Sequence, residues 1–236
     1  MSETRAGALK VDVLGIKVDD ISEEEALGIV DHLLKKPGKH YIVTPNPEFI
    51  VAAYNDPVFT KILNDADLSI ADGIGLKLVG KVKNRVTGID LMEQMIVLAS
   101  QKGYSVGFLG AKGDIAQKVA QVFKNKYPNL RISLAESGGE TFTLANLNIE
   151  SADILFVAFG HGKQEKWIAD NLSQIPVKLA MGVGGAFDVI SGNVPRAPQW
   201  MKTVGLEWLF RLIIQPWRIK RQLALLKFVW LILASG

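Results

Sequence analysis

The sequence contains no cysteine and only three histidines among its 236 residues. A chain without thiols forms no disulfide bond, offers no thiolate ligand to a metal and has no cysteine nucleophile. His32, His40 and His161 are far apart along the chain and form no metal-ligand motif. We therefore expect neither a disulfide-stabilised scaffold nor zinc chemistry.

Long apolar runs are also missing. The longest, residues 223–234, has about a dozen residues and contains Lys227, whereas a helix that spans a membrane needs about 20. Such a segment can lie on a bilayer but is too short to cross it. The first ten residues hold no apolar stretch of signal-peptide length, so nothing indicates export and we expect a location on the cytoplasmic side.

The remaining composition is that of a folded protein. Hydrophobic residues make up 48% of the chain and charged residues 22%, which excludes intrinsic disorder and low-complexity fibres. The length suits one sizeable α/β domain with an appendage and is short for two full domains.

Charge is unevenly distributed along the chain. From Arg196 to the end there are seven basic residues and one acidic residue, whereas the rest has 20 basic and 23 acidic residues. Four of the five tryptophans also lie in this last segment. Basic residues mixed with aromatic and aliphatic ones indicate an anionic partner, either a membrane or a nucleic acid.

Short β-branched runs alternate with helical patterns through most of the chain, which predicts a Rossmann-like, mostly parallel sheet with flanking helices. Helices are expected after the capping pair Ser22 and Glu25, and after the Asn-Pro and Asp-Pro pairs at positions 46 and 56. The strand pattern stops after Gly192, where Pro195 and Pro198 mark a connection. We expect an α/β catalytic domain over residues 1–194 and a basic, amphipathic, helical appendage over 195–236. Predicted strands cover residues 11–14, 41–43, 68–71, 106–109, 131–134, 154–159 and 177–181, and further helices cover 89–101, 115–127 and 164–172.

Ligands of an open α/β sheet bind beyond the carboxyl ends of the strands, so the polar residues that follow each strand are candidates for a site. Thr44 and Asn46 follow one strand, although Asn46 on its own is better explained as a helix cap. Asp72 follows another between small residues, and its pattern fits a helix cap and a catalytic base equally well.

Two glycine-containing segments follow later strands. Residues 160–167 run into a helix whose first amides could hold an anion, or they form an ordinary helix start with Glu165 near the dipole. Residues 182–188 could cradle a phosphate or could allow tight packing of strand on helix.

Two other motifs carry less weight. Residues 107–113 loosely resemble a dinucleotide fingerprint, but the first glycine lies inside the strand and no downstream acid completes a ribose contact. Asp65 and Asp67 have the spacing of a metal-binding pair, yet they precede their strand and are expected at the wrong end of the sheet. We interpret them as a turn with a cap.

Several conspicuous segments follow one another along the chain. They are Ala71-Asp72-Gly73, Arg85-Val86-Thr87-Gly88-Ile89-Asp90-Leu91, Gly162-Lys163-Gln164-Glu165, Gly184-Gly185-Ala186-Phe187-Asp188, Ser191-Gly192, Arg196-Ala197-Pro198, and Gly205-Leu206-Glu207-Trp208-Leu209-Phe210-Arg211 with Pro216 and Arg218. Taken together in this order, they are highly specific, and from about residue 11 to the end the chain resembles the WecG/TagA/CpsF glycosyltransferases of bacteria.

The resemblance implies an inverting transfer of N-acetylmannosamine from its UDP donor to undecaprenyl-diphosphate-N-acetylglucosamine, as in the linkage unit of wall teichoic acid. It implies no metal or other cofactor, a peripheral location on the cytoplasmic face of the cell membrane, an anionic membrane surface as partner and no nucleic acid. The residues that match the family's functional positions are Asp72 as the base and Thr44, Asn46, Arg85, Gln164, Arg211, Arg218 and Arg221 as substrate-binding residues.

Alternatives remain at this point. Relatives transfer other UDP-sugars for capsule or enterobacterial common antigen, a nicotinamide-dependent oxidoreductase would account for the sheet and glycines, and a non-catalytic membrane-binding module would account for the basic end. Exposed apolar side chains of that end would also favour a homo-oligomer in water.

Overall fold

The protein is described by a computed structural model that covers residues 10–79, 81–138 and 151–234. Its centre is a six-stranded parallel sheet with the strand order β4-β3-β8-β7-β5-β6. The predicted mostly parallel α/β fold is therefore confirmed. The strands of this sheet are β3 (His40–Val43), β4 (Leu68–Ser69), β5 (Ser105–Gly110), β6 (Arg131–Glu136), β7 (Ala152–Ala158) and β8 (Val177–Gly182).

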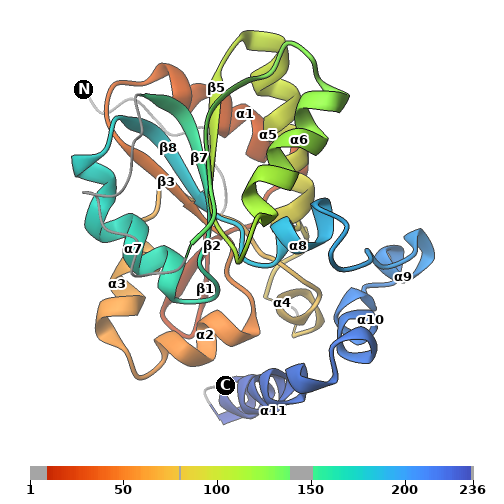
Figure 1. Cartoon of the computed structure of the whole chain (residues 1–236). Helices are drawn as coiled ribbons and strands as arrows, with labels where there is room; N and C mark the ends of the chain where they lie inside the picture. Colours follow the sequence, from red (N-terminus) through yellow and green to blue (C-terminus); the bar gives the residue numbers. More distant parts are fainter. Residues whose placement is uncertain (1–9, 80, 139–150, 235–236) are drawn as a thin grey trace.

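Helices cover both faces of the sheet (Figure 1). On one face, α1 (Glu23–Lys35), α5 (Gly88–Lys102), α6 (Ile115–Lys126) and α8 (Ala186–Ile190) enclose an apolar core that includes Phe108 and Phe156. On the other face, α7 (Lys163–Asn171) and the 3₁₀ turn η2 (Leu172–Gln174) pack on the central strands. The short helices α2 (Pro47–Ala53) and α3 (Pro57–Asp65) extend this cover toward β3.

The first predicted strand belongs elsewhere, which corrects the expectation that it joins the parallel sheet. It is β1 (Lys10–Val13), and it forms a separate antiparallel hairpin with β2 (Ile16–Asp19), a strand the sequence did not indicate. The two-residue turn between them has positive φ at both Leu14 and Gly15. A tight hairpin turn needs that backbone, but leucine is not a typical turn residue, so the pattern was missed.

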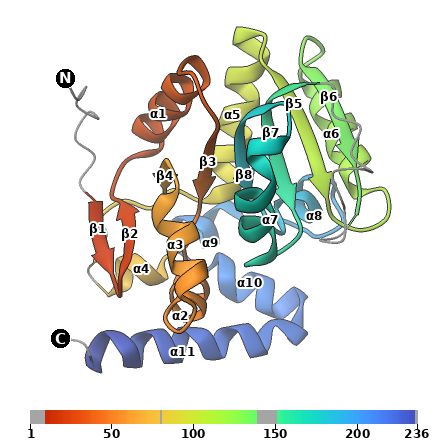
Figure 2. The same ribbon diagram turned by 90° about the vertical axis from the view of Figure 1, so that its left-hand side faces the viewer.

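The C-terminal segment is helical and folds back along the body (Figure 2). It consists of α9 (Gln199–Thr203), α10 (Glu207–Ile214), the 3₁₀ turn η3 (Pro216–Arg218) and α11 (Ile219–Ala234). Helix α11 lies beside α2, and Phe228 is fully buried in the same apolar cluster as Phe49 and Ile50. The helical content is as predicted, whereas an independent unit that begins at residue 195 stays a prediction.

Candidate active site

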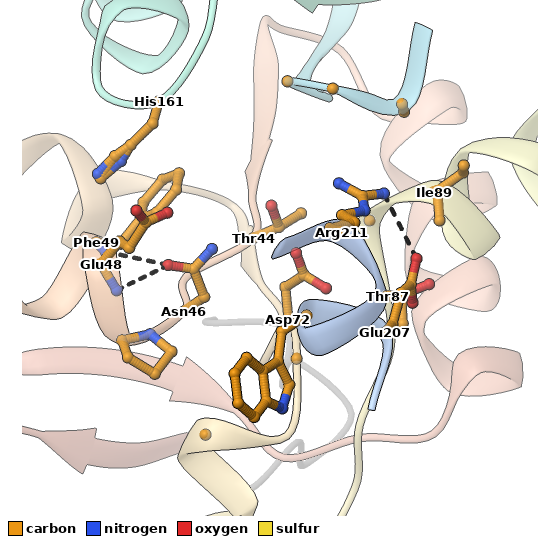
Figure 3. A pocket seen from close by; sticks show the side chains of 18 of the residues that line it. Thr44, Asn46, Glu48, Phe49, Asp72, Thr87, Ile89, His161, Glu207 and Arg211 are labelled. Carbon is orange, nitrogen blue, oxygen red and sulfur yellow. Dashed lines mark hydrogen bonds and ion pairs between the residues drawn. The ribbon is translucent and has the colours of Figure 1, made fainter. Parts of the chain in front are cut away.

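A cavity of about 330 Å³ lies at the carboxyl edge of the sheet (Figure 3). Its wall includes residues that follow four different strands, namely Thr44 after β3, Asp72 after β4, Gln164 after β7 and Gly184 after β8. All four segments singled out from the sequence thus meet at one place. The short helix α4 (Gly75–Leu78), which was not predicted, and the tail helix α10 close the cavity.

Asp72 is the carboxylate at the centre of this cavity. Its N–H donates to Pro45 O at 2.9 Å, which fixes the loop after β4 against the loop after β3. Burial raises the pKa of the Asp72 carboxyl to about 6, against the opposing effects of Arg211, the Gly88 N–H and Arg85, while the negative charge of Glu207 acts in the same direction as burial. A carboxylate whose pKa lies close to neutrality is suited to accept a proton from a substrate hydroxyl.

Two arginines reach the cavity from distant parts of the chain. Arg85 comes from the loop before α5, and Arg211 comes from α10. One oxygen of Glu207 lies 3.5 Å from Arg85 Nη2, and the other lies 3.4 Å from Arg211 Nη2. Arg85 also donates to the carbonyl oxygen of Lys202 at 3.0 Å. The two guanidinium groups are therefore held on either side of one carboxylate, beside Asp72.

Glu207 was not among the predicted site residues, although it lies in the family segment of residues 205–211. A second signal was its position four residues before Arg211 on the same helix, a spacing at which opposite charges pair. His161 and Trp208 also line the cavity; both lie in segments noted in the sequence, but neither was predicted as a site residue. The His161 ring stands edge-on to Phe49 with centroids 4.4 Å apart.

Gln164 forms part of a buried polar group below the glycine loop. Its Oε1 accepts from the Gly184 N–H at 2.9 Å, and its Nε2 donates to Glu165 at 2.7 Å. Glu165 also accepts from the Gly162 N–H at 2.8 Å, and burial raises the pKa of its carboxyl to about 7. A Cβ at position 182 would lie 2.6 Å from the ends of both the Gln164 and Glu165 side chains, so a larger residue there would displace this buried, hydrogen-bonded pair.

Asn46 both caps a helix and lines the cavity, the two possibilities considered for it from the sequence. Its Oδ1 accepts from the Glu48 and Phe49 N–H groups at 2.9 and 3.2 Å and so caps α2. The same residue lines the cavity together with the buried Thr44. The cap holds the Asn46 amide at the edge of the site.

Of the two remaining predicted arginines, the structure brings only Arg218 to the cavity among the described side chains. Arg218 lines it and donates to Gln215 at 2.8 Å. Arg218 ends the 3₁₀ turn η3 and Arg221 lies in the first turn of α11, so they do not share one regular α-helix as expected. The side chain of Arg221 lies outside the described residues.

The glycine segment at residues 107–113 and the acidic pair at residues 65 and 67 have structural explanations rather than functional ones. Gly107 lies inside β5, where a Cβ would come within 2.9 Å of the Leu155 side chain, so close packing accounts for it. Asp65 pairs with Lys61, and Asp67 pairs with the His40 ring at 3.0 Å, before β4 and away from the cavity. Within the described ranges, no three histidine, aspartate or glutamate residues gather in a way that could hold a metal ion.

A parallel sheet with a carboxylate, arginines and glycine-rich loops at its carboxyl edge defines an α/β enzyme that acts on an anionic ligand. The particular family follows from comparison of sequences. The chain belongs to the WecG/TagA/CpsF family of glycosyltransferases, whose model matches residues 11–236.

Three relatives of this chain carry the same name. The N-acetylglucosaminyldiphosphoundecaprenol N-acetyl-beta-D-mannosaminyltransferase of Bacillus subtilis strain 168 is 34% identical, over 83% of this chain and 82% of its own length. The proteins of the same name from Bacillus spizizenii and Staphylococcus aureus strain MRSA252 are 33% and 29% identical, over 91% and 93% of this chain and 88% and 90% of their own lengths.

Proposed function

We propose that this protein transfers N-acetylmannosamine from UDP-N-acetylmannosamine to undecaprenyl-diphosphate-N-acetylglucosamine, with inversion at the anomeric carbon, in the synthesis of the wall teichoic acid linkage unit. The names of its relatives support the donor and the acceptor. The observation that carries the chemistry is one cavity in which Asp72, with a pKa raised to about 6, lies beside Arg211 and Arg85.

The reaction is a single displacement. The acceptor hydroxyl oxygen attacks the anomeric carbon, a new C–O bond forms, and the bond from that carbon to the diphosphate oxygen of UDP breaks. Asp72 takes the hydroxyl proton, which makes the oxygen a better nucleophile as it attacks. Arg85 and Arg211 offset the negative charge that develops on the departing diphosphate, because guanidinium groups pair with phosphate oxygens through two parallel hydrogen bonds.

The uncharged polar residues of the cavity have a positioning role in this proposal. Thr44, Asn46 and Gln164 offer hydroxyl and amide groups from three different loops. Such groups can hold sugar hydroxyls and the acetamido group in the orientation that in-line attack requires. In this proposal Arg218, which lines the cavity and ends η3, holds the diphosphate of the lipid acceptor.

The donor sugar is tested by incubating the protein with a panel of UDP-sugars and a soluble lipid-diphosphate-N-acetylglucosamine analogue. We expect a product with the added mass of one N-acetylhexosamine, formed from UDP-N-acetylmannosamine and not from UDP-glucose. Transfer of another sugar alone would assign the protein to a capsule or common-antigen branch of the family. The oxidoreductase alternative loses the Gly107 segment as support, because packing against Leu155 explains it, and the family of the chain is one of glycosyltransferases.

Chelation of metals is expected to leave turnover intact. Arginines rather than a divalent cation offset the diphosphate charge in this proposal, and the carboxylates with metal-ligand spacing, Asp65 and Asp67, are engaged elsewhere. The measurement is the initial rate before and after incubation with EDTA. A loss of activity that magnesium or manganese restores would contradict the prediction.

The tail is proposed to hold the enzyme on an anionic membrane surface at the cytoplasmic face. No helix in the described part of the chain is long and apolar enough to span a bilayer. Helix α11 nevertheless has an outer apolar stripe, opposite the side that buries Phe228, and this stripe is more than half exposed at every position. It consists of Ile219, Leu223, Leu226, Trp230 and Leu233. A helix of this kind gains free energy by burying its apolar face at the lipid interface.

The double substitution Leu226→Gln with Leu233→Gln is expected to weaken binding to anionic vesicles more than tenfold, because full burial of one leucine contributes about 1.5–3 kcal/mol. These side chains are 69% and 76% exposed, so the fold should persist. The control pair is Val58→Gln with Val122→Gln, two exposed apolar positions outside the tail. Unchanged vesicle binding together with a shift from dimer to monomer in light scattering would assign the stripe to self-association instead.

A further inference from the structure

Glu207 is held close to Asp72 by an unusually tight contact between the tail and the body. Gly205, just before α10, has φ +77, and a Cβ at this position would overlap the side chain of Ile74. Ile74 lies two residues after Asp72 in the same loop. The start of α10, and with it Glu207, is therefore fixed against the loop that carries the catalytic carboxylate.

The Glu207 carboxylate occupies the place between two cations where an anionic ligand would be expected. It is largely buried, with 12% of the side chain exposed. Its separations of 3.5 Å from Arg85 and 3.4 Å from Arg211 are longer than the roughly 2.7–2.9 Å of a strong charge-assisted hydrogen bond. Because their contacts to Glu207 are long, both guanidinium groups can exchange this carboxylate for a phosphate that offers better geometry, while Arg85 also keeps its bond to the Lys202 carbonyl oxygen.

We propose that Glu207 is a positioning residue that holds Arg85 and Arg211 in the donor-free enzyme and yields both to the diphosphate of the donor. This inference rests on the proposed function. Two positive and two negative side chains, Arg85, Arg211, Asp72 and Glu207, balance one another before the donor arrives. The diphosphate brings additional negative charge, and the arginines move toward it.

The transfer of Arg85 and Arg211 from Glu207 to the donor also makes Asp72 a stronger base. Once its arginines pair with the donor, Glu207 is a negative charge beside Asp72 with less compensation than before. A negative neighbour favours proton uptake, so Asp72 becomes a stronger base when the donor is in place. The other titratable or charged groups that line this cavity are Glu48, His161 and Arg218.

The test is Glu207→Gln, which keeps the shape of the side chain and removes its charge. We expect UDP to bind about three- to tenfold more tightly in calorimetry, because a competing carboxylate is gone. We also expect kcat with UDP-N-acetylmannosamine and a soluble acceptor to fall about three- to tenfold, with the acidic limb of its pH profile shifted to lower pH. A residue that only supported the fold would weaken UDP binding and turnover together.

Two further variants serve as controls for Glu207→Gln. Glu207→Asp retains the charge and is expected to keep the acidic limb of the wild type. Glu93→Gln removes a body-to-tail ion pair with Arg196 outside the cavity and is expected to change neither UDP affinity nor the pH profile. If Glu207→Gln bound UDP more weakly and its acidic limb were not shifted, the role of Glu207 would be wrong while the proposed function would stand. If the wild-type protein did not bind UDP, both the role of Glu207 and the proposed function would be wrong.

Discussion

Turnover is expected to fall by about 10²–10⁴-fold when Asp72 is replaced by asparagine, because this is the usual contribution of one general base. UDP affinity should change little, since the arginines that face the diphosphate remain. The measurements are kcat with the soluble acceptor and the dissociation constant for UDP. Asp65→Asn, at a surface ion pair with Lys61 away from the cavity, is the matched control and should retain full activity.

The stability of the same variant distinguishes loss of a base from loss of the fold. The pKa of Asp72 is raised to about 6 from the ordinary value of 3.8, so folding favours its protonated form. Ionisation of Asp72 therefore lowers the stability of the folded protein as pH rises through this interval, and the penalty is fully present at pH 7. Asp72→Asn removes that penalty and should raise the melting temperature at pH 7 while abolishing the acidic limb near pH 6 in the activity profile. Near-normal turnover by a folded Asp72→Asn variant would show that Asp72 is not the base.

Much of the site could be predicted because of a general property of parallel sheets. The carboxyl ends of β3, β4, β7 and β8 meet at one edge, so residues directly after each strand converge there whatever the details of packing. Thr44 and Asp72 were found in this way, as was the segment of residues 160–167 that contains Gln164, whose own role came from the family resemblance. The same rule placed Asp67, which precedes β4, at the opposite, amino edge of the sheet, where it pairs with His40 at the start of β3.

Residues whose position depends on long-range packing could not be predicted. Glu207 becomes part of the site only because α10 folds against Ile74, more than a hundred residues earlier in the sequence. Helix α11 is apolar on most of its circumference, so its sequence does not reveal that Phe228 faces α2 and Leu226 faces solvent. Local patterns specify the helix, and tertiary contacts decide which face is buried.

Arg211→Gln is expected to reduce kcat by about 10²–10³-fold, the usual effect of removing one group that stabilises transition-state charge. Arg211 comes from the tail, yet its guanidinium lies in the cavity, 3.7 Å from where a Cβ at position 185 would be and beside Asp72. UDP affinity should fall about tenfold, because the contact to the diphosphate already exists in the bound state. Binding to anionic vesicles should stay unchanged, since this side chain does not belong to the exposed stripe of α11.

The matched variant is Lys227→Gln, which removes an exposed basic residue from α11 itself. A basic residue near an anionic membrane surface contributes about 1 kcal/mol, so vesicle binding should weaken about fivefold while turnover of a soluble acceptor is retained. Opposite effects of the two substitutions would separate the catalytic part of the tail from its membrane-binding part. If Arg211→Gln transferred the sugar to a soluble acceptor at the wild-type rate, the tail would serve only as an anchor, and Arg85 would be left as the cation nearest to Asp72 on the body side of the cavity.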